Sequence, residues 1–299
     1  MDAFWLLLTC LALGAAVARW AQPPIGLAQM LNWWVINIAL PALVLYLVPR
    51  IHLDPSLWFL VASQWLVFGG AWLLFEGLGR RLNWSRARIG ALVLVCGLGN
   101  TSFMGYPMID ALRGQDALAL AVIADQLGCF VALAVGGAVV AAMYSGKPAN
   151  ASEIGRRVLR FPPFLALLAA LVVGLLGGWP VPVNGVLQPI GQTLTPLALF
   201  SVGLRFRPRI SRDQALPVVL GLSWKLLLAP LLALALGVVA GSSGQTLHVG
   251  VLEAAMAPMI SAAILADQHH LDPPLANAVL AFGILLSLLS VPAWHLMLG

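Results

Sequence analysis

The chain has 299 residues, of which 61% are hydrophobic and only 9% are charged, whereas about 25% of the residues in a typical soluble domain are charged. This composition excludes a soluble globular protein and is typical of an integral membrane protein. The net charge of +5 would suit a nucleic-acid partner only if the basic residues formed a patch.

Apolar segments, each about long enough to cross a bilayer, follow one another along the chain. The first competes with a signal peptide, but Met1-Asp2 is not a basic start, so we interpret it as a retained helix. We therefore predict one membrane domain with ten spans, at residues 3–20, 26–49, 55–79, 87–112, 117–145, 161–179, 184–204, 213–240, 245–268 and 274–297.

Two of the predicted spans are interrupted. The fourth contains Gly97-Leu-Gly-Asn-Thr-Ser-Phe-Met-Gly-Tyr-Pro-Met-Ile109, and the ninth contains Ala255-Met-Ala-Pro-Met-Ile-Ser261. Backbone groups that lose their helical partners inside a bilayer must be buried in protein or line a polar cavity. Two such breaks in corresponding positions of two halves indicate the binding site of a transporter.

The basic residues are concentrated in the loops that follow odd-numbered spans. Positive charge accumulates on the cytoplasmic side of a membrane protein, so we predict that these loops are cytoplasmic and that both termini are outside. In a bacterial cell this is a multi-pass protein of the inner (plasma) membrane, and no nucleic-acid partner is expected. Thirteen of the 16 basic residues follow this rule: Arg19, Arg80, Arg81, Arg86, Arg88, Lys147, Arg156, Arg157, Arg160, Arg205, Arg207, Arg209 and Arg212.

Prolines relate the two halves of the chain. Asn37 lies four residues before Pro41, and Gln192 lies four residues before Pro196. An arginine follows each proline nine residues later. The fourth and ninth spans share Pro-Met-Ile, and residues 119–124 weakly resemble 276–281, a match that chance would also explain.

Each half has five spans, an odd number, so the second half must begin on the opposite side of the membrane. The predicted fold is therefore all-α, with two inverted five-helix repeats whose fourth helices are broken and cross. The predicted parts are a first repeat at 1–145, a short cytoplasmic linker at 146–160 and a second repeat at 161–299.

The breaks provide groups that suit an anion. Pro107 and Pro258 remove helical hydrogen bonds, and each second half-helix has a partly positive N-terminus. The side chains of Asn100, Thr101 and Ser102 add polar groups. Asn37 and Gln192 are further candidates for binding substrate, although hydrogen bonding between helices would also explain them.

Three ionisable residues lie deep in predicted spans, where they are costly and usually functional: Asp125, Lys225 and Glu253. We interpret them as candidates for proton coupling or as fixed counter-charges. One hypothesis is that Lys225 pairs with a buried carboxylate or replaces a coupling sodium ion, and the alternative is a snorkelling lysine. Glu76, four residues before Arg80, is expected to form an exposed ion pair. No metal-ligand spacing is present in the sequence, and no cofactor is expected.

The segment Asn100-Thr-Ser-Phe-Met-Gly-Tyr-Pro107 resembles a signature of the auxin efflux carrier family. Residues 258–283 and 195–203 are similar to later helices of that family. The resemblance implies a bacterial-type member with ten helices, a crossed-helix domain and the fold of the bile-acid/sodium symporters. Members of the family move organic anions, so a small organic anion is the expected substrate.

The sequence thus predicts a secondary transporter of small carboxylates that works by alternating access in the lipid bilayer, with efflux as the expected direction. The alternatives are a ligand-sensing or channel-like protein on the same fold and a sodium-coupled symporter. Proton coupling, sodium coupling and a homodimer stay open. An intramembrane enzyme is disfavoured, because the sequence has no Gly-x-Ser-x-Gly motif and no facing aspartate pair.

Overall fold

The computed structural model describes residues 2–21, 23–51, 54–146, 152, 155–156, 159–205 and 210–299. Within these residues the chain is helical, and the only β-structure is one isolated bridge. Most of the predicted linker at 146–160 lies outside the described residues.

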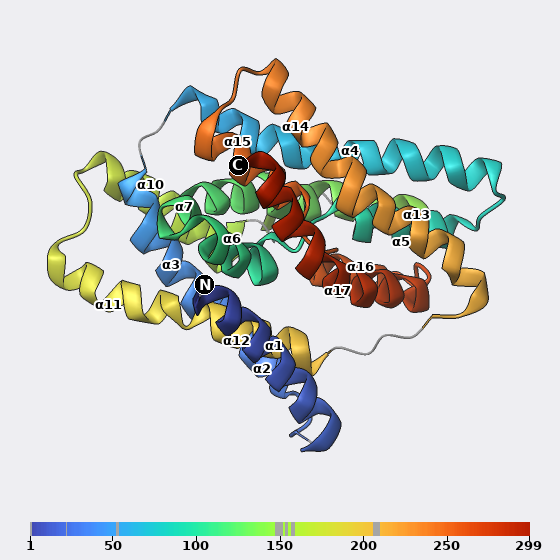
Figure 1. The fold of residues 1–299 in the computed structure, drawn as a ribbon, viewed down its shortest axis with the longest axis horizontal. Coiled ribbons are helices and arrows are strands. Elements are labelled where there is room, and N and C mark those ends of the chain that lie inside the picture. The colour runs from blue at the N-terminus through green and yellow to red at the C-terminus, as the bar shows by residue number, and fades with distance from the viewer. Residues whose placement is uncertain are drawn as a thin grey trace. The chain divides into compact units, whose positions relative to one another are not determined.

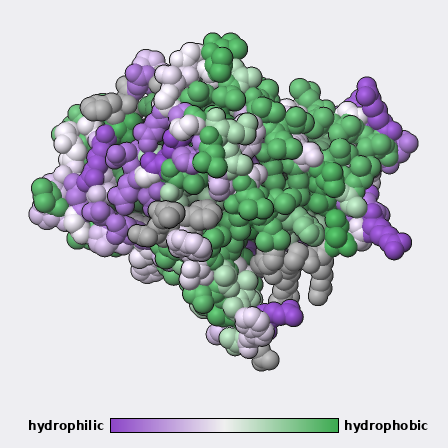
Figure 2. Space-filling model, viewed as in Figure 1, coloured by the Kyte–Doolittle hydropathy of each residue, from purple (hydrophilic) through white to green (hydrophobic). Residues whose placement is uncertain are grey.

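Five helical segments in the described part of the chain are long and apolar enough to cross a membrane, as expected for a multi-pass protein. Two shorter apolar helices, Trp5–Trp20 and Pro162–Leu175, accompany them. Large apolar side chains are exposed, including Leu73, Leu289 and Leu296, and hydrophobic residues cover much of the face drawn in Figure 2. Such exposure suits contact with lipid. The five segments are Leu27–Arg50, Trp58–Arg81, Gln115–Ser145, Arg212–Val239 and Pro273–Leu298.

The chain forms two compact units, and each draws on both halves of the sequence. Unit 1 comprises residues 1–54, 102–122 and 156–206. Its helices, labelled in Figure 1, are α1 (Asp2–Trp20), α2 (Leu27–Trp34), α3 (Leu40–Leu47), α6 (Tyr106–Arg113), α7 (Gln115–Ile123), α10 (Pro162–Leu175), α11 (Val181–Gln192) and α12 (Leu194–Leu204).

Glycines allow close helix packing in unit 1. Helices α1 and α12 lie side by side. A Cβ atom on Gly14 would lie 2.2 Å from the carbonyl oxygen of Phe200, and one on Gly203 would lie 2.3 Å from that of Leu11. Small residues of this kind let helix backbones approach each other in membranes.

Unit 2 comprises residues 55–101, 123–155 and 207–299. The π-helical segments η5 (Ala124–Cys129), η6 (Ala132–Gly137) and η8 (Trp224–Leu228) lie within longer helical runs of this unit. Its α-helices are α4 (Trp58–Arg81), α5 (Arg86–Gly97), α8 (Ala138–Ser145), α13 (Ala215–Ser223), α14 (Ala229–Val239), α15 (Gly244–Ala254), α16 (Ile260–Gln268) and α17 (Pro273–Leu298).

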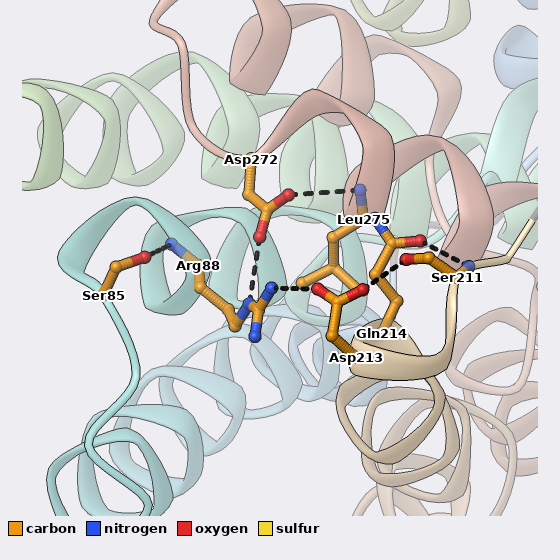
Figure 3. A network of polar contacts seen from close by, with 7 residues as sticks. All are labelled: Ser85, Arg88, Ser211, Asp213, Gln214, Asp272 and Leu275. Carbon is orange, nitrogen blue, oxygen red and sulfur yellow. Dashed lines mark hydrogen bonds and ion pairs between the residues drawn. The ribbon is translucent and has the colours of Figure 1, made fainter.

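A polar network joins the first turns of three helices of unit 2 (Figure 3). Arg88 of α5 donates to Asp272, which precedes α17, at 3.0 Å and to Asp213, which precedes α13, at 3.1 Å. Asp272 also accepts a weak bond from the backbone N–H of Leu275 and so caps α17. Because Arg88 and Asp272 are both mostly buried, this network fixes the three helix starts relative to one another.

Candidate functional site

Both interruptions predicted from the sequence are present, and they pair with each other inside unit 2. Helix α5 ends at Gly97, α15 ends at Ala254, and α16 begins at Ile260. The backbone N–H of Asn100 donates to the carbonyl of Ala257 at 2.7 Å. The N–H of Met259 donates to the carbonyl of Leu98 at 3.0 Å, so Gly99 and Pro258 form an antiparallel bridge.

Local sequence explains why the helices stop here. Pro258 has no N–H to donate and clashes with a preceding helical turn. Leu98 and Met259 adopt extended backbone conformations, with ψ of 130° and 129°. The bridge then satisfies part of the backbone that the two breaks expose, as a chain inside a membrane requires.

The first break carries polar side chains that are buried. Thr101 donates its hydroxyl proton to the carboxylate of Asp125, and Gln126 donates to the other oxygen of that carboxylate at 2.7 Å. The thiol of Cys129 donates to the carbonyl of Gly99 at 3.3 Å. Asn100 is only 2% exposed, and its side-chain nitrogen has no hydrogen-bond partner among the described residues.

The second break brings a buried cation and a buried carboxylate to the same place. Lys225 of η8 donates to the carbonyl of Ala254 at 3.0 Å. Neither oxygen of the Glu253 carboxylate has a hydrogen-bond partner in the described part of the chain. Both side chains are fully buried. A buried polar atom without a partner is costly, and a functional role is one of the explanations for it.

The structure thus gathers six of the predicted site residues around the paired breaks of unit 2, namely Asn100, Thr101, Asp125, Lys225, Glu253 and Pro258. The other four, Ser102, Pro107, Asn37 and Gln192, belong to unit 1. Pro107 is buried near the start of α6.

The predicted amides of unit 1 have different surroundings. The side chain of Asn37 donates to the carbonyl of Trp33 at 2.8 Å, one turn earlier in its own helix. Gln192 lines a cavity of about 280 Å³ within unit 1. The walls of that cavity are mostly apolar, and its polar and aromatic lining residues include Tyr46, Tyr106, Asp110, Gln115, Gln188 and Thr195.

Sequence reasoning did not single out two polar groups of the site. Gln126, next to Asp125, donates a hydrogen bond to that carboxylate, and Cys129 donates one to the carbonyl of Gly99 in the first break. Gln126 is a polar residue inside an apolar run, and this pattern in the sequence could have identified it as a candidate site residue. The expected exposed pair is present, because Arg80 donates to Glu76 at 2.8 Å.

Comparison with known proteins agrees with these features. Residues 6–295 match the model of a family described as membrane transport protein. The chain is 28% identical to an "uncharacterized transporter" of Methanothermobacter thermautotrophicus, over 91% of this chain and 89% of that protein.

Plant relatives match a smaller part. The chain is 25% identical to auxin efflux carrier component 6 of Arabidopsis thaliana, over 49% of this chain and 27% of that protein. It is 27% identical to a probable auxin efflux carrier component 5c of Oryza sativa, over 50% of this chain and 43% of that protein. Because the family model covers nearly the whole chain, the protein is a membrane transporter, not an enzyme, and it belongs to the membrane transport protein family of the auxin efflux carriers.

Proposed function

We propose that the protein is a secondary transporter of small organic anions, and that the anion binds at the paired breaks. The observation that carries this proposal is the side-chain nitrogen of Asn100, which is buried beside the Gly99–Pro258 bridge and has no hydrogen-bond partner among the residues that the structure describes. A hydrogen-bond donor held in this way is ready for an acceptor such as a carboxylate, because leaving it unpaired costs free energy.

The backbone adds to the attraction for an anion. Helix α16 begins directly after the second break, and its first N–H groups carry partial positive charge. Thr101 supplies a further polar group at the first break, although its own proton is directed to Asp125. Ser102, Pro107, Asn37 and Gln192 stay predictions from the sequence.

The proposed topology is ten spans in two inverted repeats, with both termini outside, the linker 146–160 in the cytoplasm and the protein in the inner membrane of a bacterial cell. The network of Figure 3 supports the assignment of sides. Arg88, Asp213 and Asp272 lie at the starts of the predicted fourth, eighth and tenth spans, and Arg88 forms an ion pair with each of the two aspartates. The starts of these three spans therefore meet at one end of unit 2, as the proposed topology requires.

In this proposal, transport proceeds by alternating access, and efflux is the proposed direction. The chain's partners are the substrate anion and the lipid bilayer.

Counterflow in proteoliposomes tests the proposal. Purified protein is reconstituted with unlabelled malonate, malate or indole-3-acetate inside, and uptake of the same labelled acid is measured. A carrier accelerates uptake when substrate is present on the opposite side, whereas a channel or a sensor does not. Absence of this stimulation for every organic acid in a broad panel contradicts the proposal.

Asn100→Ala locates the site in the same assay. We expect at least a tenfold loss of exchange, equivalent to about 1.4 kcal/mol of lost interaction. Asn277→Ala is the matched control, because Asn277 lies exposed on α17 of the same unit. Equal exchange by the two variants rules out the assignment of the site.

A further inference from the structure

A cavity of unit 2 lies apart from the paired breaks, where the end of α4 meets the start of α5. It has a volume of about 610 Å³, and none of the residues that line it belongs to either break. Its walls come from α4, from the turn after α4, from α5 and from α8, and α4 and α5 pack side by side (Figure 1). The polar and aromatic residues that line this α4–α5 cavity include Trp72, Glu76, Arg80, Trp84, Arg86 and Tyr144.

Arg86 is held at the wall of the cavity by the end of α8. Its Nη2 donates to the carbonyl of Met143 at 2.7 Å, and its guanidinium carbon lies 5.8 Å from the centre of the Tyr144 ring, within the range of a cation–π contact. The bond to Met143 engages one N–H group of a guanidinium that has five. Arg86 therefore has a fixed position and keeps donors for an anion in the cavity.

Arg80 is oriented by a chain of hydrogen bonds across the same cavity. Trp72 donates to the hydroxyl of Tyr144 at 3.1 Å, and Tyr144 donates to the carboxylate of Glu76. The Nε of Arg80 donates to the other oxygen of Glu76 at 2.8 Å. Two arginines and one glutamate line the cavity, so their charges sum to one positive charge at neutral pH. The cavity thus suits a ligand with a single negative charge.

An apolar groove leads away from this cavity along α4. It has a volume of about 500 Å³, and all six of its lining residues belong to α4, so it lies on the outer face of that helix. A Cβ on Gly69 or Gly77 would meet nothing within 4 Å, and Leu73 is 80% exposed. The groove shares three residues with the cavity, namely Trp72, Glu76 and Arg80.

The length of the groove matches one leaflet of a bilayer. Helix α4 is long and apolar enough to cross a membrane. From Gly69 to Arg80 it rises about 16 Å, at about 1.5 Å per residue, which is about half of the hydrocarbon thickness of a bilayer. An apolar groove of this length that ends at two arginines has the chemistry of a phospholipid, with its acyl chain in the groove and its phosphate at the guanidinium groups.

We propose that unit 2 binds one anionic phospholipid, with its phosphate in the α4–α5 cavity beside Arg80 and Arg86 and an acyl chain along the groove of α4. A zwitterionic headgroup is disfavoured, because it brings a second cation to a cavity that is already positive. A free phosphate ion does not use the groove. In the proposed topology this end of α4 is cytoplasmic, so the lipid belongs to the inner leaflet, where basic pockets between helices bind anionic headgroups.

Native mass spectrometry of the purified protein in detergent tests the site. The probe is dioleoyl phosphatidylglycerol, which carries one negative charge, and dioleoyl phosphatidylcholine is its zwitterionic counterpart with the same chains. The first phosphatidylglycerol should bind about fivefold more tightly than phosphatidylcholine, the difference expected for one net positive charge. Equal affinity for the two lipids contradicts the proposal.

Arg80→Gln and Arg86→Gln should each weaken the binding of phosphatidylglycerol about fivefold. Arg81→Gln is the matched control, because Arg81 is exposed at the neighbouring position and lines neither the cavity nor the groove. It should bind the lipid like the wild type, and an equal loss in all three variants would show general attraction by surface charge instead of a site. If Arg86→Gln does not fold, Arg80→Gln decides, since the Arg80 side chain is 77% exposed.

Gly77→Leu tests the groove separately from the cavity. The added side chain fills the groove without displacing a neighbour, and it should weaken the binding of phosphatidylglycerol about threefold because the acyl chain loses its contacts with α4. Gly185→Leu is the control, since a Cβ on Gly185 of α11 also meets nothing within 4 Å. Unchanged binding by Gly77→Leu rules out the groove as the position of the chain.

Thermal unfolding in detergent distinguishes the lipid from a free anion. Phosphatidylglycerol should raise the Tm, because a ligand that binds the folded state stabilises it, whereas an excess of inorganic phosphate should leave the Tm unchanged. If phosphate raises the Tm as much as the lipid does, and Arg80→Gln removes that rise, the ligand is a free anion and the lipid assignment is wrong. These measurements detect binding alone, so a negative result leaves the proposed transport function untouched.

Discussion

Gly99 leaves no room for a side chain between the paired breaks and the buried lysine. A Cβ there would lie 3.1 Å from the Lys225 nitrogen and 3.3 Å from the carbonyl oxygen of Glu253. Both distances are shorter than ordinary van der Waals contacts. One neighbour is backbone held by the break, and the other is an ammonium held by the carbonyl of Ala254, so neither yields without disturbing the site.

We therefore expect Gly99→Ala to displace the Lys225 ammonium and reduce exchange at least tenfold, with a loss of about 1–3 kcal/mol of stability from overpacking. Gly69→Ala is the control, because a Cβ on Gly69 of α4 meets nothing within 4 Å and alanine favours a helix. Thermal unfolding in detergent and counterflow measure the two effects. If both variants behave like the wild type, the close packing around Gly99 has no role in transport.

Residue types in the sequence predicted much of the candidate site but not its hydrogen bonds. Lys225, Glu253 and Asp125 are conspicuous because ionisable residues are rare in apolar spans, and the prolines locate the breaks. The sequence does not reveal that Thr101 donates to Asp125 or that Cys129 donates to Gly99. Such contacts join residues 24 and 30 positions apart, and their geometry depends on how the helices pack.

At the scale of elements, the contact between α1 and α12 depends on how closely the backbones of the two helices approach each other. Gly14 and Gly203 face each other across it, and added Cβ atoms would lie 2.2 Å and 2.3 Å from carbonyl oxygens of the opposite helix. A backbone atom at this distance cannot rotate away as a flexible side chain does. The small residues thus set the separation of the two helices, which otherwise have no hydrophobic driving force to associate in lipid.

Gly14→Val should force α1 and α12 apart and lower the stability of unit 1 by about 1–3 kcal/mol or more. Thermal unfolding in detergent is the measurement, and exchange activity should fall with the folded fraction. Gly185→Ala provides the comparison, because a Cβ on Gly185 of α11 meets nothing within 4 Å. A Gly14→Val protein as stable as the wild type would show that the helices do not pack through these glycines.

Element boundaries were predictable where proline and glycine interrupt apolar runs, as at α5 and α15. The composition of the compact units does not follow from the internal similarity of the sequence. The internal similarity of the sequence divides the chain near residues 146–160, yet each unit combines segments from both halves. Similarity along the chain reports related segments, whereas packing depends on which apolar and small surfaces match, as at Gly14 and Gly203.

At the scale of the whole molecule, the distribution of charge predicts which side of the membrane each loop faces. Arg88 brings Asp213 and Asp272 to one end of unit 2, and most basic residues lie in loops that parity assigns to that same side of the membrane. Both arguments predict that Ser85 and Ser211, which lie in this network, face the cytoplasm. Gln115, which follows the predicted fourth span, should face the opposite side.

Single cysteines test this arrangement in a background where Cys10, Cys96 and Cys129 are replaced by alanine. A membrane-impermeant maleimide added to intact cells should label Gln115→Cys but not Ser85→Cys or Ser211→Cys. Inverted vesicles should show the reverse pattern, because the positively charged loops are retained on the cytoplasmic side during insertion. Counterflow by the cysteine-free protein shows that the background still folds. Labelling of Ser85→Cys and Gln115→Cys from the same side would mean that the predicted fourth span between them does not cross the membrane. That result contradicts the proposed topology.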